Sequence, residues 1–189
     1  MVISFNGDEG SGKSTIAKLV AAKLDWPRYY MGQIFRDMAA KRNLTVVEYA
    51  KLGETDPSID KEVDDYLIDL SKKESDLIIE SRTAWHFIPQ SLKIYLKVDE
   101  KEGAARVFKE LQEENKRNEI KGDFSLEDVL KKIRERRATD NARYMKYYAI
   151  DIRDEKNYDF VLDTTKLSKE EVFDKVMDFI SLKNNGKLN

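Results

Sequence analysis

The pattern Gly-x4-Gly-Lys-Ser at residues 7–14 constrains the fold of this 189-residue chain more than any other feature. It follows the apolar run Val-Ile-Ser-Phe at residues 2–5 and precedes apolar residues at helical spacing. A glycine-rich turn between a strand and a helix binds phosphate, because backbone N–H groups and the positive end of the helix dipole face the anion. We therefore expect a nucleoside triphosphate to bind here. The loop consists of Gly7, Asp8, Glu9, Gly10, Ser11, Gly12, Lys13, Ser14 and Thr15.

Two side chains of this loop have specific chemistry. Lys13 should reach the β- and γ-phosphates, and the Ser14 hydroxyl should bind Mg²⁺. The loop alone does not say where the γ-phosphate goes. A GTP-dependent switch would carry Asn-Lys-x-Asp, but Asn-Lys-Arg-Asn at residues 115–118 lacks the closing Asp. A motor or transporter ATPase would normally be longer and carry an apolar strand ending in Asp, whereas that strand here ends in Glu80.

Strand and helix patterns alternate along the chain. Strand-like apolar runs occur at residues 2–5, 28–30, 77–79, 94–98 and 158–162. Helical patterns occur at residues 13–24, 32–41, 45–50, 57–70, 100–119, 125–148 and 168–182, and we expect residues 183–189 to fray. The alternation predicts one α/β domain with three layers, α/β/α, around a five-stranded parallel sheet. Residues 36–73 and 105–148 do not fit the alternation, so we expect them to be helical inserts over the site.

Composition excludes several other classes of protein. The 34 basic and 36 acidic residues give a net charge of −2, which indicates no nucleic-acid partner. There is no cysteine and one histidine, so thiolate chemistry and clusters of Cys or His around a metal are excluded. No apolar run approaches the roughly 20 residues of a membrane-spanning helix. We expect a soluble, cytoplasmic monomer with no membrane partner.

A second group of charged residues lies on the long helical pattern at residues 125–148. Arg136, Asp140 and Arg143 fall on one helix face. Arginine binds phosphate oxygens in pairs and stabilises charge that spreads over a transferred phosphoryl group. Taken alone, the pattern is more typical of an exposed helix with charge pairs.

Four segments together resemble the cytidylate (CMP) kinases, in particular the shorter, archaeal-like branch of the P-loop nucleoside monophosphate kinases. The resemblance covers the whole chain up to residue 166. Its segments are the loop with Ser-Thr-Ile-Ala at residues 14–17, Met-Gly-Gln-Ile-Phe-Arg at residues 31–36, Ile-Glu-Ser-Arg at residues 79–82, and residues 134–144 followed by Asp-Thr-Thr at residues 163–165. The loop is common to many P-loop proteins, whereas the other three segments are more specific.

The resemblance implies a central loop-bearing strand, an acceptor-binding insert at about residues 36–73 and a mobile lid at about residues 103–136. It implies the following site residues. The acceptor would be bound by Gly32, Arg36, Arg82, Asp140 and Arg143, with Asp140 at the sugar. Arg136 and Arg143 would approach the phosphates as the lid closes. The ATP side would include Arg106, Thr165 and Lys166, and Glu80 or Asp8 could hold a magnesium-bound water.

The implied reaction transfers the γ-phosphoryl group of ATP to CMP or dCMP with Mg²⁺. Two alternatives stay open. One is a kinase for another nucleoside monophosphate or small phosphate acceptor, and the other is a nucleotide-binding regulatory protein without turnover. The chain departs from the family pattern at Met31, Ser81, residues 83–86 and Gly103. We expect Trp85 and His86 to be structural rather than base-binding.

Overall fold

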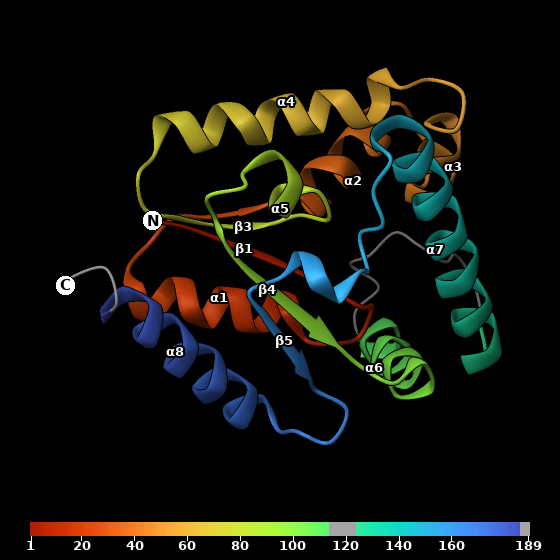
Figure 1. The fold of residues 1–189 in the computed structure, drawn as a ribbon. Coiled ribbons are helices and arrows are strands. Elements are labelled where there is room, and N and C mark those ends of the chain that lie inside the picture. Colours follow the sequence, from red (N-terminus) through yellow and green to blue (C-terminus); the bar gives the residue numbers. More distant parts are fainter. Residues whose placement is uncertain (114–123, 186–189) are drawn as a thin grey trace.

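The computed structural model describes residues 1–113 and 124–185 of the chain. Within these residues a parallel sheet has the strand order β2-β3-β1-β4-β5 (Figure 1). The strands are β1 (Val2–Gly7), β2 (Arg28–Tyr30), β3 (Leu77–Glu80), β4 (Leu92–Lys97) and β5 (Phe160–Asp163). The predicted five-stranded parallel sheet is confirmed, and the loop-bearing strand β1 is central.

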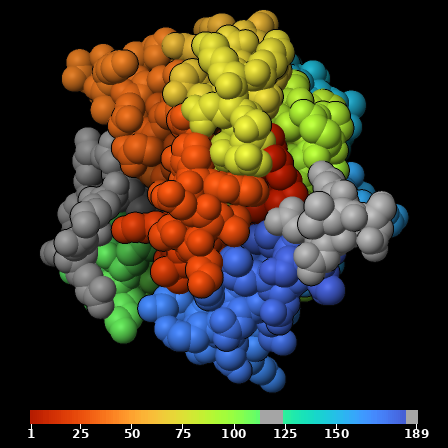
Figure 2. All heavy atoms as spheres, turned by 90° about the vertical axis from the view of Figure 1, so that its left-hand side faces the viewer, coloured from red at the N-terminus to blue at the C-terminus, as the bar shows by residue number. Residues whose placement is uncertain are grey.

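Helices cover both faces of this sheet, so the predicted three layers are confirmed. The helices are α1 (Lys13–Leu24), α2 (Met31–Lys41), α3 (Val46–Leu52), α4 (Ser58–Lys73), α5 (Ala84–Phe87), α6 (Glu100–Glu113), α7 (Leu126–Tyr148) and α8 (Lys169–Asn185), with a 3₁₀ turn η1 (Glu155–Asn157). α1 and α8 lie on one face, and α2, α4 and α5 lie on the other (Figure 1). Figure 2 views the end near the N-terminus, where α4, α1 and α8 form adjoining surfaces. No helix in the described part of the chain is long and apolar enough to cross a membrane.

The strands are apolar at consecutive positions because both faces of the sheet are covered. In β3, Ile78 packs in the core formed with α1 and α8, whereas Leu77 and Ile79 pack in the core formed with α4. All three side chains are fully buried. Burial of one such side chain contributes about 1.5–3 kcal/mol. Side chains on both faces of the strand are buried, so polar and apolar residues do not alternate along its sequence.

The topology brings the loop and Glu80 to one edge of the sheet. From β1 the chain runs to β2 and β3 on one side and then to β4 and β5 on the other. In such sheets ligands bind at the carboxyl ends of the strands where the order reverses. The register pairs Phe5 with Glu80 and Gly7 with Leu96, so the ends of β1, β3 and β4 meet at this edge.

The remaining helices, α3, α6 and α7, lie beyond this edge (Figure 1). α6 and α7 share a small apolar core of Ala104, Val107, Leu111, Val129 and Ile133. α4 is more than an insert, because Val63, Leu67 and Leu70 pack on the sheet. The proposed insert at residues 36–73 therefore contains a helix of the α/β core. Its boundaries and those of the lid stay predictions.

Side-chain hydrogen bonds confirm some of the predicted helix starts. The predicted ends of several other helices and strands were wrong. Thr45 and Glu48 form a capping box where the helical pattern at residues 45–50 begins. Pro57 precedes α4 rather than starting it, because the Asp56 carboxylate accepts from the Ser58 N–H. β4 begins at residue 92 instead of 94. β5 begins at residue 160 instead of 158. α5 and η1 were not predicted.

The last predicted helix extends further than expected. α8 continues to residue 185, so the fraying predicted for residues 183–185 was wrong. The Ser168–Glu171 cap fixes its start, and Val172, Val176 and Ile180 anchor it in the core. The predictions for residues 114–119, the turn at residues 121–123 and the tail at residues 186–189 lie outside the described residues.

One departure from the family pattern, Gly103, has a packing reason. A Cβ atom at Gly103 would lie 2.5 Å from the Glu9 carbonyl oxygen and 2.9 Å from Val98. A Cβ atom at Gly10 would lie 2.2 Å from the Gly103 carbonyl oxygen. The loop backbone and the first turn of α6 are therefore in direct contact, which leaves no room for an arginine at residue 103.

The substitution Gly103→Ala tests this contact, because it should lower the free energy of unfolding instead of raising it. In a helix interior Gly→Ala normally stabilises by about 1 kcal/mol. Here the methyl group meets loop backbone, so we expect a loss of about 1–3 kcal/mol in the free energy of unfolding and weaker ATP binding. Urea denaturation and ATP titration measure the two effects. A variant that is more stable than the wild type would contradict the packing argument.

Candidate active site

The loop after β1 faces a hollow of about 430 Å³. Gly10 and Gly12 have φ angles of 78° and 82°, a left-handed conformation that favours glycine. Gly12 is the N-cap of α1 and makes no side-chain cap, so the helix start faces the hollow without a competing oxygen. The hollow brings together these residues of the predicted ATP site: Gly10, Gly12, Lys13, Ser14, Thr15 and Arg106.

Other loop residues fix the loop to the sheet. The Asp8 carboxylate accepts hydrogen bonds from the Tyr95 hydroxyl at 3.0 Å and the Val98 N–H at 3.2 Å. A Cβ atom at Gly7 would lie 2.2 Å from the Leu96 carbonyl oxygen. The Asp8 side chain is thus engaged with β4 and the residue that follows it. This geometry does not support the alternative that Asp8 holds a magnesium-bound water.

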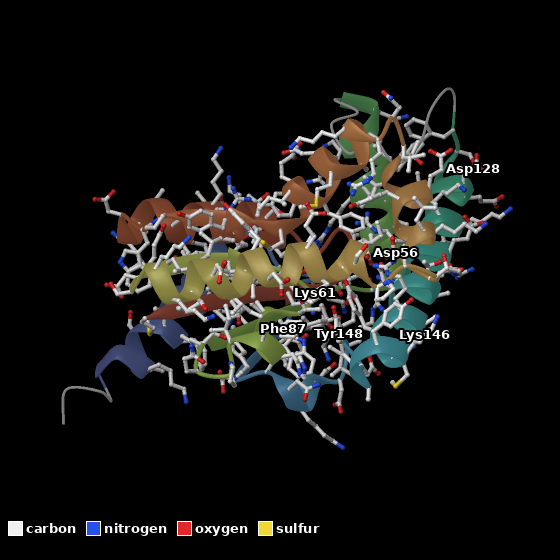
Figure 3. All side chains as sticks on the ribbon, turned by 90° about the horizontal axis from the view of Figure 1, so that it is seen from above. Asp56, Lys61, Phe87, Asp128, Lys146 and Tyr148 are labelled. Atoms are coloured by element: carbon white, nitrogen blue, oxygen red, sulfur yellow. The ribbon has the colours of Figure 1, made fainter. Side chains whose placement is uncertain are left out.

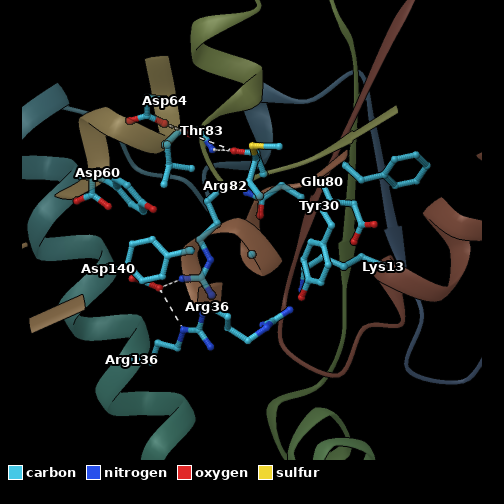
Figure 4. Close-up of a pocket in the computed structure, with 18 of the residues that line it drawn as sticks. Lys13, Tyr30, Arg36, Asp60, Asp64, Glu80, Arg82, Thr83, Arg136 and Asp140 are labelled. Atoms are coloured by element: carbon cyan, nitrogen blue, oxygen red, sulfur yellow. Dashed lines mark hydrogen bonds and ion pairs between the residues drawn. The ribbon is translucent and has the colours of Figure 1, made fainter. Parts of the chain in front are cut away.

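A second cavity of about 100 Å³ lies next to the hollow (Figure 4). It brings together the predicted acceptor residues and one further predicted arginine: Gly32, Arg36, Arg82, Arg136, Asp140 and Arg143. Lys13, Tyr30 and Arg36 line both spaces. The hollow at the loop and the arginine-lined cavity therefore share one wall, at which Lys13 stands.

Asp140 organises the arginines of this cavity. Its side chain is buried and forms ion pairs with Arg82, with Arg143 at 3.1 Å and with Arg136 at 3.9 Å (Figure 4). Because a buried carboxylate needs charged or hydrogen-bonding partners, Asp140 and the arginines stabilise one another. The predicted contact between Asp140 and a sugar stays a prediction.

Arg143 is the largest fully buried side chain among the described residues. Its guanidinium donates to Asp60 at 2.8 and 3.1 Å and to the Ala50 carbonyl at 3.1 Å. It thereby joins α7 to α3 and α4, which is a structural role. Breaking a buried pair of this kind typically costs about 3–5 kcal/mol. The approach of Arg143 to the phosphates stays a prediction.

The cavity also carries an acidic wall, formed by Asp60 and Asp64, that the sequence analysis missed. The Asp64 carboxylate accepts from the Thr83 hydroxyl at 2.7 Å and from the Tyr148 hydroxyl at 2.6 Å. Tyr148 packs edge-on against Phe87 at 5.2 Å between ring centroids (Figure 3). Burial raises the pKa of Asp64 to about 6 against the lowering effect of these two hydrogen bonds. The spacing of four between Asp60 and Asp64 on α4 was the signal available in the sequence.

Glu9 of the loop faces the arginines rather than the hollow. Its buried carboxylate lies 3.0 Å from Arg82, 2.8 Å from Arg137 and 3.9 Å from Arg153. Burial alone would raise the pKa of Glu9, but the nearby positive charges of these arginines and Lys13 lower it well below its usual range. Glu9 is therefore ionised at the centre of a positively charged cluster.

Arg137 and Arg153 were not predicted as site residues. Arg137 lies one position beyond Arg136 on α7, and Arg153 lies in the segment between α7 and η1. Neither falls on the helix face defined by Arg136, Asp140 and Arg143. Their partner Glu9 is more than 120 residues away along the chain, so no local pattern indicated the contact.

Arg106 connects the loop side to the turn at residues 163–166. It donates to the carbonyl oxygens of Thr164 at 3.1 Å and Thr165 at 3.0 Å. An adjoining hollow of about 340 Å³ is lined by Thr164 and Leu167 together with loop residues. Thr165 and Lys166, which the resemblance places on the ATP side, are not among its lining residues, and Lys166 is exposed. Their role on the ATP side stays a prediction.

The oxygen ligands that Mg²⁺ requires are present at the sheet edge. Glu80 is buried, and one of its carboxylate oxygens is paired with Arg28. The other oxygen, Oε2, is buried without a hydrogen-bond partner. Ser14 lines the hollow at the start of α1. A hydroxyl and an unsatisfied carboxylate oxygen suit a hard cation and its water shell, so these residues fit the ion.

The residues near Arg82 that depart from the family pattern contact one another and the backbone. The Ser81 and Thr83 hydroxyls lie 3.1 Å apart, and the Trp85 indole N–H donates to the Arg82 carbonyl at 3.0 Å. His86 is exposed and packs beside Trp85 at 5.6 Å between ring centroids. Neither Trp85 nor His86 lines the arginine-lined cavity. Their geometry fits the structural role that we expected.

Together, the parallel sheet, the phosphate loop and the adjoining arginine-lined cavity define the class of P-loop kinases. Residues 2–166 match the model of the cytidylate kinase-like family. The chain belongs to this family, which confirms the resemblance found in the sequence.

Individual relatives agree with this assignment. A cytidylate kinase of Pyrobaculum aerophilum is 38% identical over 170 residues, covering 89% of this chain and 86% of the relative. A cytidylate kinase of Sulfolobus acidocaldarius is 36% identical over 186 residues, covering 97% of this chain and 96% of the relative. A solved shikimate kinase of Bacteroides thetaiotaomicron is similar in fold, with a TM-score of 0.65 at 14% identity over 96% of this chain and 98% of that one.

The raised pKa of Asp64 predicts a specific pH dependence of stability. Between pH 4 and pH 6 the folded protein holds a proton that the unfolded chain has released. The contribution of Asp64 to stability is therefore lost as pH rises through this range, by about 3 kcal/mol in all. In Asp64→Asn this loss should be absent. Denaturant unfolding of both proteins at pH 4, 5, 6 and 7 measures it. Parallel stability curves would contradict the prediction.

Proposed function

We propose that the protein is a nucleoside monophosphate kinase that transfers the γ-phosphoryl group of ATP to CMP or dCMP, giving ADP and CDP or dCDP. The observation that carries the proposal is the wall at Lys13, shared by the phosphate loop's hollow and a cavity lined by Arg36, Arg82 and Arg136. The relatives' name, cytidylate kinase, supports the choice of CMP. We further propose that it acts in the cytoplasm as a monomer.

On the donor side, the loop backbone and Lys13 bind the ATP phosphates, and Arg106 lies beside them. Mg²⁺ would be held by the Ser14 hydroxyl and the phosphates, with the Glu80 carboxylate accepting from its water shell, and it would neutralise phosphate charge. The adenine would lie in the hollow next to Thr164.

On the acceptor side, Arg36 and Arg82 bind the monophosphate. The acidic wall of Asp60 and Asp64 would face the base. Cytosine carries an amino donor where uracil carries a carbonyl oxygen, and carboxylates accept hydrogen bonds from such a donor. The wall therefore favours cytosine over uracil. Residues 36–73 would form the acceptor-binding insert and residues 103–136 the lid.

Catalysis needs alignment and charge neutralisation. An oxygen of the acceptor phosphate attacks the γ-phosphorus, the bond to the β,γ-bridging oxygen breaks, and ADP leaves. The acceptor is already an anion, so no general base is required. Lys13 and the arginines stabilise the charge on the transferred group, and closure of the lid excludes water.

The proposal is tested by ADP release from ATP and Mg²⁺ with a panel of CMP, dCMP, UMP, AMP and GMP. We expect kcat/KM to be highest for CMP or dCMP. An equal or better rate with another monophosphate would favour a kinase for that acceptor. ATP binding without turnover by any acceptor would favour a regulatory nucleotide-binding protein. Either result would reject the CMP kinase proposal.

Lys13→Ala should lower kcat/KM by about 10²–10³-fold, the usual effect of removing one group that stabilises transition-state charge. The far-UV circular dichroism spectrum should not change, because Lys13 faces the two cavities. Lys18→Ala, one turn further along α1 on the exposed side, is the matched control and should keep full activity. Full activity of Lys13→Ala, or loss of its folded spectrum, would contradict the assignment.

A further inference from the structure

Glu9 connects the phosphate loop to three arginines from three other parts of the chain. One carboxylate oxygen lies against Arg82, which follows β3. The other lies against Arg137 of α7 and near Arg153, which follows α7. No other carboxylate of the described residues is paired with all three of these arginines.

The arginines need a negative charge when no substrate is bound. Burial lowers the pKa of Arg82, the neighbouring Arg136 lowers it further, and Glu9 opposes both effects. Without the Glu9 carboxylate, several guanidinium groups would repel one another in a poorly solvated space. Glu9 therefore stabilises the arginine cluster in the ligand-free state.

The same contact competes with a substrate. Arg82 uses one terminal nitrogen for Glu9 and the other for Asp140, so both ends of its planar fork are occupied. A phosphate that approaches the same two nitrogens competes with these carboxylates for them. The cavity supports this conclusion, because its volume of about 100 Å³ is below the roughly 300 Å³ typical of ligand pockets.

Glu9 can withdraw from Arg82 without losing all its partners. Asp140 would remain buried among Arg136 and Arg143, which hold it from its own helix. If Arg82 turns to a phosphate, Glu9 keeps Arg137 and Arg153 as partners and does not become an isolated buried charge. Release of Arg82 by Glu9 therefore leaves no buried carboxylate unpaired.

We propose that Glu9 is a positioning residue that serves as an internal substitute for the acceptor phosphate: it holds Arg82 in the empty site and releases it when the acceptor's phosphate arrives. The inference rests on the proposed function, which assigns the acceptor phosphate to Arg82. It has two consequences. Glu9 lowers the affinity for the phosphate group, and it assists release of the phosphorylated product by taking Arg82 back.

The test compares wild type with Glu9→Gln, which keeps the shape and removes the charge. Calorimetric titrations with CMP and with cytidine, both without ATP, separate the phosphate from the nucleoside. We expect Glu9→Gln to bind CMP about tenfold more tightly and cytidine equally. In steady state its acceptor KM and its kcat should both fall. Glu100→Gln is the matched control, because Glu100 pairs with Arg137 but not with Arg82, and its CMP affinity should equal that of the wild type.

Unchanged or weaker CMP binding by Glu9→Gln would overturn the inference, as would equal tightening in Glu100→Gln. A purely structural role would raise the acceptor KM, which is the opposite sign. If Glu9→Gln does not fold, Glu9→Asp replaces it, since its shorter arm competes less and should also tighten CMP binding; no tightening overturns the inference.

Inorganic phosphate separates this inference from the proposed function. If CMP is not the acceptor, wild type will not bind it, but phosphate should still raise the melting temperature of Glu9→Gln more than that of wild type. Equal shifts in melting temperature would overturn the role of Glu9 whatever the acceptor is.

Discussion

The site depends on how closely the loop after β1 lies against its neighbours. Gly7 contacts the Leu96 backbone, and Gly10 contacts the backbone of Gly103 at the start of α6. The Asp8 side chain adds hydrogen bonds to Tyr95 and to the backbone after β4. These contacts set the direction of the loop's N–H groups and of α1 before any phosphate is present. Preorganised donors of this kind need little reorganisation when charge develops in the transition state.

The arginines around the loop would repel one another when no ligand is bound, and buried carboxylates offset this repulsion. Asp140, Asp60 and Glu9 each neutralise guanidinium groups that a nucleotide phosphate would otherwise have to balance. The acids differ in their surroundings. All three line the cavity, but Asp60 and Asp140 are tied to the fully buried Arg143, whereas Glu9 belongs to the loop. The folded protein thus keeps a phosphate-binding site stable in the absence of phosphate.

Local patterns were sufficient to predict most of the fold. Continuous apolar runs indicated the strands because both faces of the sheet are covered, and the side chains of Thr45 and Ser125 fixed two helix starts. The phosphate loop was recognisable because its chemistry requires a fixed spacing. The ends of β4 and β5 were less predictable, because they depend on pairing with neighbouring strands rather than on local sequence.

The site was predictable only where its residues follow a motif. Arg36, Arg82, Arg136 and Asp140 fall in segments that resemble a family, and they meet in one cavity. Arg153 lies in an irregular segment, and its contact with Glu9 depends on the path of the whole chain. The side chain of Glu9 also showed no signal, since the loop motif leaves that position open. Contacts between distant segments decide its role.

The buried position of Arg143 limits how the molecule can move. Its contacts with Asp60 and the Ala50 carbonyl join α3, the start of α4 and the C-terminal part of α7. Rotation of all of α7 would break these contacts at a cost close to the stability margin of a domain. A movement of this part of α7 would therefore have to carry α3 and the start of α4 with it.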